Sequence, residues 1–253
     1  MDHANGYVQS EHRGNRTIIT FYHPQSNSMP SALLRELARQ IRTAGDDTQT
    51  RLVILQSAGE KAFCAGASFD ELVAIRNAEE GLAFFMGFAL VINAIRTIPK
   101  FVIGRVQGKC VGGGVGLAAA SDYCLATGQA EVKLSELAVG IGPFVVGPAV
   151  ERKLGTSAFS QLAINATQWR SAAWAKENGL FADIYPDIAE LDRAVDTLAG
   201  TLENSSPEAM FELKKICWAG TESWDQLLAE RAAISGRLIL SEHSKAALAR
   251  FKR

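Results

Sequence analysis

The sequence predicts an α/β fold, in which short strands alternate with helices along most of the chain. An uninterrupted apolar run at residues 52–55 is typical of a strand that is buried on both faces, and a second, mainly apolar run at 101–106, which contains Arg105, also predicts a strand. Between these runs, apolar residues recur three and four positions apart, which is the spacing of a helix with one buried face. Hydrophobic residues make up 47% of the 253, so the chain can bury a sizeable core.

The chain opens with a predicted β-hairpin, whose strands at residues 7–10 and 16–21 flank a turn at 12–15. A helix is expected over residues 30–42, because apolar residues recur there at helical spacing. The helical pattern is broken at Gly45, Asp46 and Asp47, and the first apolar run follows. The opening order is therefore strand, strand, helix, strand.

A loop of small residues at 63–67 leads into a short helix near Leu72, and a longer helix is expected from about residue 79 to 98. The aromatic residues of the longer helix indicate a core face rather than a ligand site. Pro99 ends that helix, and the second apolar run follows. The alternation is completed by a helix at 117–120 and by strands at 122–126 and 131–134.

Beyond residue 144 the pattern becomes mainly helical. Helices are expected at 146–154, 157–164, 171–178, 188–202, 206–218 and 222–240. The last fifty or so residues show no strand pattern and predict a helical appendage that buries its apolar face by oligomerisation. We therefore divide the chain into an α/β core, residues 1–190, and a C-terminal helical oligomerisation region, residues 191–253.

The charge balance argues against a nucleic-acid partner or a membrane surface. Lys and Arg number 26 and Asp and Glu number 27, which gives a net charge of −1, whereas binding to phosphate backbones or anionic lipid favours a basic face. The sequence contains no run of about 18 apolar residues, so no membrane span is expected. The first ten residues lack the pattern of a secretory signal. We expect a cytoplasmic protein, in which Arg250, Lys252 and Arg253 could hold a small anion.

Cysteine and histidine spacing excludes several common kinds of site. No C-x-x-C pair or zinc pattern occurs, so no metal is expected and the cysteines are interpreted as reduced core thiols: Cys64, Cys110, Cys124 and Cys217. All four histidines lie near the ends of the chain, and neither G-x-S-x-G nor H-E-x-x-H is present. Nucleophilic triads and zinc hydrolases therefore become poor candidates.

Six glycines fall between residues 104 and 116. A dinucleotide fingerprint would need a third glycine at Leu117, and the spacing before Lys109 does not match a P-loop. The glycines either let a helix pack tightly on a strand or let the backbone approach a ligand with free N–H groups. The loop at 63–69 also lies between a strand and a helix, so one N–H from each loop could converge on one oxygen as an oxyanion hole.

Three ordered segments resemble the signatures of a known superfamily. Residues 61–67 (KAFCAGA), the stretch from 99 to 114 that ends in GKCVGGG, and residues 135–143 are similar to segments of the crotonase (enoyl-CoA hydratase/isomerase) superfamily. The resemblance implies repeated ββα units wound into a spiral, with C-terminal helices that build homotrimers or homohexamers. It also implies an acyl-CoA thioester as substrate and no separate cofactor, since coenzyme A is part of the substrate.

Carried over by position, the resemblance assigns binding of the thioester oxygen to the backbone N–H groups of Ala67 and Gly113. The C-terminal basic residues would meet the phosphates of coenzyme A. The substrate would further be bordered by Ala65, Gly66, Phe69, Gly112 and Gly116.

The resemblance also bears on the number of acids. Hydratases of this superfamily resemble each other in having two glutamates, one two residues beyond the triple glycine and one in the third segment. This chain has Gly116 at the first of these positions and keeps only the glutamate of the third segment, Glu136. One carboxylate can take a proton beside the thioester and return it two carbons away, so we expect isomerisation of a 3-enoyl to a 2-enoyl thioester by Glu136. Two alternatives stay open: hydration with a non-standard second acid, and a catalytically silent acyl-CoA-binding protein.

Other ionisable residues near these segments have structural interpretations. Asp122 is expected to cap or pair, while Asp70 and Glu71 are interpreted as a solvated helix start, although one of them could replace the missing acid. Arg105 lies within a predicted strand, and a charge there needs a partner. We expect that partner to be Asp122 or Glu136, and pairing with Glu136 would weaken it as a base.

Overall fold

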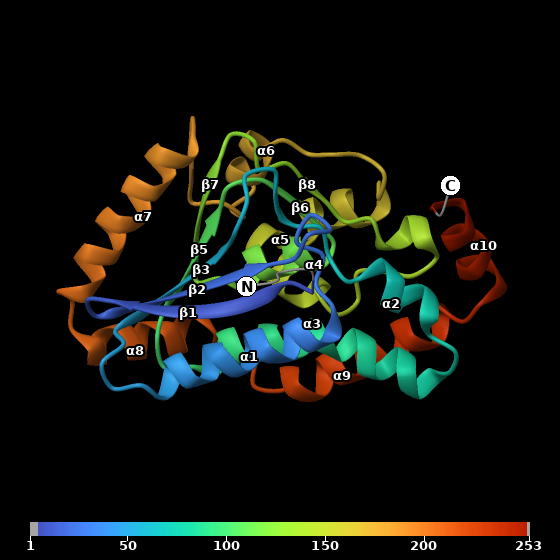
Figure 1. Ribbon diagram of the computed structural model, residues 1–253, viewed down its shortest axis with the longest axis horizontal. Coiled ribbons are helices and arrows are strands. Elements are labelled where there is room, and N and C mark those ends of the chain that lie inside the picture. Colours follow the sequence, from blue (N-terminus) through green and yellow to red (C-terminus); the bar gives the residue numbers. More distant parts are fainter. Residues whose placement is uncertain (1–4, 252–253) are drawn as a thin grey trace.

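The structure is a computed structural model that describes residues 5–251, and it has the expected α/β architecture, with helices on both sides of a central sheet (Figure 1). Within these residues the main sheet has the strand order β1-β2-β3-β5-β7-β9, where β1 and β2 are antiparallel and the other neighbours are parallel. Its strands are β1 (Tyr7–Arg13), β2 (Arg16–Tyr22), β3 (Leu52–Ser57), β5 (Val102–Val106), β7 (Tyr123–Thr127) and β9 (Asp183–Tyr185).

A second, smaller sheet is parallel and contains β4 (Ala62–Cys64), β6 (Lys109–Val111) and β8 (Val132–Lys133), in that order. The chain therefore passes three times from a strand of the main sheet to a strand of the small sheet and on to a helix. The three passes are β3-β4-α2, β5-β6-α4 and β7-β8-η1. This repetition confirms the spiral of ββα units that the resemblance implied.

Helices account for most of the remaining described chain. In the first half these are α1 (Ser31–Asp46), α2 (Phe69–Ala74), α3 (Ala78–Thr97), α4 (Gly113–Ala120) and the short 3₁₀ helix η1 (Glu136–Val139). They are followed by α5 (Gly147–Ile164), α6 (Ala172–Glu177), α7 (Ile188–Glu203), α8 (Pro207–Cys217), α9 (Trp224–Leu238) and α10 (Glu242–Phe251). Side-chain caps mark several starts; for example, Ser206 accepts a hydrogen bond from the Ala209 N–H where α8 begins.

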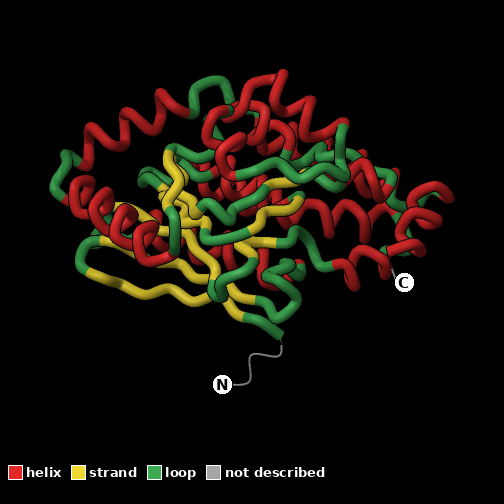
Figure 2. Tube along the Cα trace, turned by 90° about the horizontal axis from the view of Figure 1, so that it is seen from above, coloured by secondary structure: helices red, strands yellow, loops and turns green. Residues whose placement is uncertain are grey.

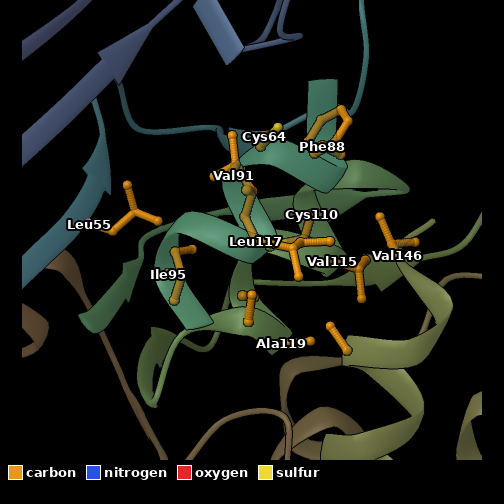
Figure 3. Close-up of a cluster of buried hydrophobic side chains, with 14 of the residues drawn as sticks. Leu55, Cys64, Phe88, Val91, Ile95, Cys110, Val115, Leu117, Ala119 and Val146 are labelled. Atoms are coloured by element: carbon orange, nitrogen blue, oxygen red, sulfur yellow. The ribbon is translucent and has the colours of Figure 1, made fainter. Parts of the chain in front are cut away.

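The apolar runs of the main sheet are buried on both faces, as their lack of alternation predicts. In β3, Val53 and Leu55 belong to the large core cluster that includes α1 and α3, whereas Leu52 and Ile54 belong to a smaller cluster with α7. Figure 3 shows part of the large cluster, where side chains of α3 and α4 lie together with Leu55 of the sheet. Each face of the sheet thus has its own covering helices.

Helix α1 ends at Asp46 with Asp47 as its C-cap, within the break that the sequence predicts at residues 45–47. Gly45 has a second use there, because a Cβ atom at this position would lie 2.4 Å from Cγ2 of Ile98, the C-cap residue of α3. Gly45 is therefore required for close packing between the ends of two helices, which the sequence alone could not show.

The remaining differences concern short elements. Strands β6 and β9 have three residues each and helix α10 has ten; none of these elements was expected. Helix α4 begins at Gly113 rather than at residue 117. Its first turn contains three glycines and therefore shows no helical pattern of apolar residues. The helices expected at 146–154 and 157–164 meet as α5 at Gly155, whose φ of +74° breaks the helical conformation.

The C-terminal helices pack on the core. Helix α7 covers one face of the main sheet through Leu191, Val195 and Ala199, so the boundary expected at residue 190 falls inside this helix. Helix α9 packs along α3. Helices α7 and α10 lie at opposite ends of the long axis of the molecule (Figures 1 and 2). The role of residues 191–253 in oligomerisation stays a prediction.

Helix α3 is long and apolar enough to cross a membrane by length and composition alone, which the search for apolar runs had not indicated. Of its most apolar 18-residue window, 56% is buried inside the structure. Both α1 and α9 pack against it. The core helix of a globular protein meets the same criterion, so this feature is weak evidence for a membrane span.

A buried ion pair attaches α8 to the core. The Lys214 Nζ lies 2.9 Å from Oδ2 of Asp122 and donates to the carbonyl oxygens of Ile95 (2.7 Å) and Lys100 (2.6 Å). Asp122 also accepts the indole N–H of Trp218 at 2.6 Å. The structural role expected for Asp122 is confirmed.

Two expectations about single residues were wrong. Arg105 pairs with neither Asp122 nor Glu136; its Nε donates to Oδ1 of Asp192 at 2.6 Å, because α7 brings that residue over the sheet from far along the chain. Cys217 is exposed, whereas the other three cysteines are buried thiols.

Replacing Lys214 by Met is expected to lower the free energy of unfolding by about 3 kcal/mol, because the buried Asp122 carboxylate loses its cation. The adjacent Lys215 is exposed and pairs with Glu212 one helical turn away. Its replacement by Met is expected to change the free energy of unfolding by less than about 0.5 kcal/mol. Urea unfolding measures both variants, and equal effects would contradict a special role for the buried pair.

Candidate active site

Three segments that follow the strands of the small sheet meet at one edge of that sheet. Ala67 follows β4, Gly113 follows β6, and Glu136 follows β8. Because the three strands are parallel, their carboxyl ends lie on the same side, which is where open parallel sheets commonly bind ligands. The order β4-β6-β8 places the Gly113 turn between the other two segments.

The loops after β4 and β6 are in backbone contact. A Cβ atom on Gly114 would lie 2.2 Å from the carbonyl oxygen of Cys64, and a Cβ atom on Gly66 would lie 3.7 Å from the Gly113 nitrogen. Gly66 has a φ of +93°, a region that favours glycine. The glycines in these two loops thus permit a separation that side chains would prevent.

Two backbone N–H groups in these loops lack an acceptor in the part of the chain that the structure describes. Within residues 5–251, neither the Ala67 N–H nor the Gly113 N–H donates a backbone hydrogen bond, although Ser68, directly after Ala67, donates to Met29. Gly113 is the first residue of α4, and the first N–H groups of a helix have no partner inside it. Both residues line the same cavity.

This cavity has a volume of about 460 Å³. Seven of the eight site residues expected from the sequence line it: Ala65, Gly66, Ala67, Phe69, Gly112, Gly113 and Glu136. The sequence analysis missed most of the apolar wall, which includes Phe84, Phe85, Phe88, Phe144 and Val146. The aromatic residues of α3 were assigned to the core only; their helical spacing could not show that the same face also lines a cavity.

Gly116 is the exception among the expected residues. It is not part of the cavity lining, and a Cβ atom there would lie 2.5 Å from Cγ1 of Val146. Gly116 therefore serves the packing of α4 against the start of α5, and its expected place beside the substrate stays a prediction. A longer side chain at residue 116 would require Val146 to move.

Glu136 is the only ionisable side chain among the described residues that line the cavity. Its Oε2 atom is buried and has no hydrogen-bond partner within residues 5–251. Burial raises the pKa of the carboxyl group from 4.5 to about 7, and a hydrogen bond from its own backbone N–H opposes this shift. At neutral pH the group can therefore both accept and donate a proton.

Gly112 leaves space for this carboxylate. A Cβ atom at residue 112 would lie 2.8 Å from Oε1 of Glu136, and the φ of +51° with ψ of −112° is not a conformation of ordinary L-residues. The same glycine accepts from the Val115 N–H as α4 begins. Gly112 therefore couples the start of α4 to the position of Glu136.

Neither acid near the first loop substitutes for the one absent at residue 116. Glu71 accepts hydrogen bonds from the backbone N–H and the hydroxyl group of Ser31, and Asp70 accepts from Gln25. Neither lines the cavity. Among the described residues no group of three or more His, Cys, Asp or Glu could hold a metal ion. Of the basic C-terminal residues, Lys252 and Arg253 lie outside the described chain.

Known proteins are similar to this chain along most of its length. The sequence profile of the family described as Enoyl-CoA hydratase/isomerase matches residues 12–252. The Bacillus subtilis (strain 168) protein named "Probable enoyl-CoA hydratase" is 26% identical over 236 residues, which cover 92% of this chain and 91% of that protein. The Bos taurus protein named 3-hydroxyisobutyryl-CoA hydrolase, mitochondrial, is 32% identical over 159 residues, but the match spans only 41% of its length.

Solved structures agree in fold. The crystal structure of an enoyl-CoA hydratase from Mycobacterium avium matches with a TM-score of 0.84 and 26% identity, covering 100% of this chain and 97% of that one. An enoyl-CoA hydratase from Bacillus halodurans matches with a TM-score of 0.88 at 22% identity, covering 96% of this chain and 99% of that one, a likeness that shows the fold alone.

Replacing Glu136 by Gln is expected to change how stability depends on pH. The folded-state pKa of about 7 lies above the unfolded value of 4.5, so the stabilising contribution of Glu136 is complete below pH 4.5 and is lost as pH rises through 7. The free energy of unfolding of the native protein, relative to the variant, should fall by about 3 kcal/mol across this window. Urea unfolding of both proteins at pH 5 and pH 8 measures the difference, and parallel pH dependences would contradict a raised pKa.

Proposed function

Because the chain belongs to the enoyl-CoA hydratase/isomerase family, we propose that it isomerises a 3-enoyl-CoA thioester to the 2-enoyl-CoA thioester. The observation that carries this proposal is that, among the described residues, Glu136 alone supplies an ionisable side chain to a cavity bordered by two backbone N–H groups that have no acceptor there. A double-bond shift needs one group that removes a proton and returns it, whereas addition of water usually needs a second group to activate the water molecule.

In the proposed reaction, the N–H groups of Ala67 and Gly113 bind the thioester oxygen, and the Glu136 carboxylate removes a proton from C2. The electron pair moves onto the thioester oxygen, where the two N–H groups stabilise the charge; each such donor is typically worth about 3 kcal/mol in the transition state. Protonated Glu136 then delivers the proton to C4, and the double bond lies between C2 and C3. Atoms and charge balance, and the carboxylate is regenerated.

The apolar wall favours this reaction over hydration. Residue 116, where hydratases of the superfamily are expected to carry a glutamate, is a glycine packed on Val146. The lining of the same cavity includes the apolar residues Val139, Ile141 and Phe144. No second carboxylate or imidazole among the lining residues is available to hold a water molecule.

Hydration of a 2-enoyl-CoA is the second candidate, because the relative that the chain matches over 91% of its length is named an enoyl-CoA hydratase. Thioester hydrolysis is a third outcome to be tested, since the Bos taurus relative is named a hydrolase. One set of assays separates these reactions: the purified protein is incubated with 3-enoyl-CoA, 2-enoyl-CoA and saturated acyl-CoA, and the products are separated by chromatography.

We further propose that the protein forms homotrimers or homohexamers, the latter being pairs of trimers. Helix α8 carries apolar side chains that the chain itself leaves exposed: Phe211, Leu213 and Ile216. Leu213 and Ile216 are three residues apart and therefore share one side of the helix. An exposed apolar helix face commonly marks a contact with another subunit.

Replacing Glu136 by Gln is expected to reduce the isomerisation rate constant, kcat, by about 10²- to 10⁴-fold, because the amide cannot take the proton. Binding of a saturated acyl-CoA, measured by calorimetry, should stay within about threefold, since the thioester oxygen is bound by backbone groups.

Glu131→Gln is the matched control, because Glu131 lies just before β8, is half exposed and pairs with Lys109. Its kcat should be that of the native protein. Isomerisation that survives in Glu136→Gln, or hydration by the native protein without any isomerisation, would contradict the proposed reaction.

Replacing both Leu213 and Ile216 by Asp is expected to convert the oligomer to monomers, because the interface would then bury charges. Light scattering on a sizing column measures the mass. Ile164→Asp is the control, since Ile164 is exposed to 74% but lies on α5. A native protein that is monomeric at assay concentration would rule out the proposed assembly.

A further inference from the structure

The C-terminal region contributes one residue to the cavity. Among the described lining residues, Ser235 of α9 alone comes from beyond Val146. Its side chain is 1% exposed, and its Oγ atom donates to the carbonyl oxygen of Arg231 in the same helix at 3.3 Å. The hydroxyl group is thus paired within its own helix, and the residue presents a small wall to the cavity.

Ser235 is held in place by an unusually close helix crossing. A Cβ atom on Gly81 of α3 would lie 2.7 Å from the Gly236 Cα, and a Cβ atom on Gly236 would lie 2.8 Å from the carbonyl carbon of Gly81. The backbones of α3 and α9 therefore touch at this point. Because Ser235 directly precedes Gly236, it must lie against the first turns of α3.

The same helix α3 connects this crossing to the two N–H groups. A Cβ atom on Gly113 would lie 2.1 Å from the ring of Phe88, so Phe88 marks the level of the proposed oxyanion hole. Gly81 lies seven residues earlier on α3, which corresponds to about 10 Å along a helix that rises 1.5 Å per residue. Phe84 and Phe85 line the cavity between these two levels, with ring centroids 5.0 Å apart.

A buried apolar cluster from the C-terminal helices lies beside this part of the cavity. Ile239 and Leu248 form it with Ile141, and Leu72, Phe85 and other cavity residues pack against it. A hydrocarbon chain that leaves the N–H pair along α3 therefore meets aromatic rings first and α9 next. Ser26, which also lines the cavity, lies near the N–H pair instead, because its carbonyl oxygen accepts from the Ala65 N–H.

We propose that Ser235 forms the end wall of the acyl pocket and limits the substrate to short and medium-length acyl chains. The inference rests on the proposed acyl-CoA function and assigns the acyl chain to the stretch of the cavity along α3, between Phe88 and the α3–α9 crossing. Neither the fold nor the presence of Glu136 requires this limit, because it depends on the size of one side chain on α9.

Ser235→Leu tests the wall by moving it toward the N–H pair. The affinity for a medium-length saturated acyl-CoA, measured by calorimetry, is expected to fall about 10- to 100-fold, while the affinity for the two-carbon and four-carbon thioesters stays within about twofold. Ser235→Ala removes only the hydroxyl group and should keep the native profile or extend it toward longer chains. If Ser235→Leu does not fold, Ser235→Val makes the same comparison with a smaller side chain.

Ala233→Leu is the matched control, because Ala233 is exposed on the same helix, and its chain-length profile should be native. If Ser235→Leu lost affinity for acyl-CoA thioesters of all chain lengths alike, or kept the native chain-length profile, the proposal that Ser235 forms the end wall would be wrong. Failure of the native protein to bind any acyl-CoA would instead refute the proposed function. Because binding is measured with saturated thioesters, the result does not depend on which reaction the protein catalyses.

Discussion

The close approach of the β4 backbone to the first turn of α4 is the constraint on which the candidate site depends. Cys64 and Gly114 are so near each other that a single added Cβ atom would overlap a carbonyl oxygen. This contact brings together two chain segments that are separated by almost fifty residues, and the N–H groups of Ala67 and Gly113 lie beside one cavity with no acceptor among residues 5–251. Rigid backbone donors of this kind need no reorganisation when charge develops near them.

The second requirement is a carboxyl group kept in apolar surroundings. An isolated buried carboxylate is costly, and the structure shows this cost as a raised pKa and an oxygen without a partner at Glu136. An ion pair with Arg105 would have removed the cost and lowered the basicity. Arg105 pairs with Asp192 of α7 instead, so structural pairing and proposed chemistry stay separate.

The sequence predicted much of this arrangement because the relevant patterns are local. Apolar runs without alternation predicted β3 and β5, and small-residue loops before helices predicted where N–H groups are free. The sequence did not reveal the role of a residue where one residue type has several structural uses, as glycine does. Gly45 and Gly116 gave no sign in the sequence of their packing role, in which Ile98 and Val146 occupy the space beside them. Strands of three residues were too short to show a period.

By itself, the sequence determined which residue types stand at the three loops: glycines where the backbone must approach closely, and one acid instead of two, since these depend on residue identity alone. Only the tertiary structure decided what surrounds them. The partner of Arg105, the burial of Glu136, the contact of Gly116 with Val146 and the place of Ser235 all join segments that are distant in the chain. Such contacts depend on how helices cross and sheets stack, and no local spacing encodes that geometry.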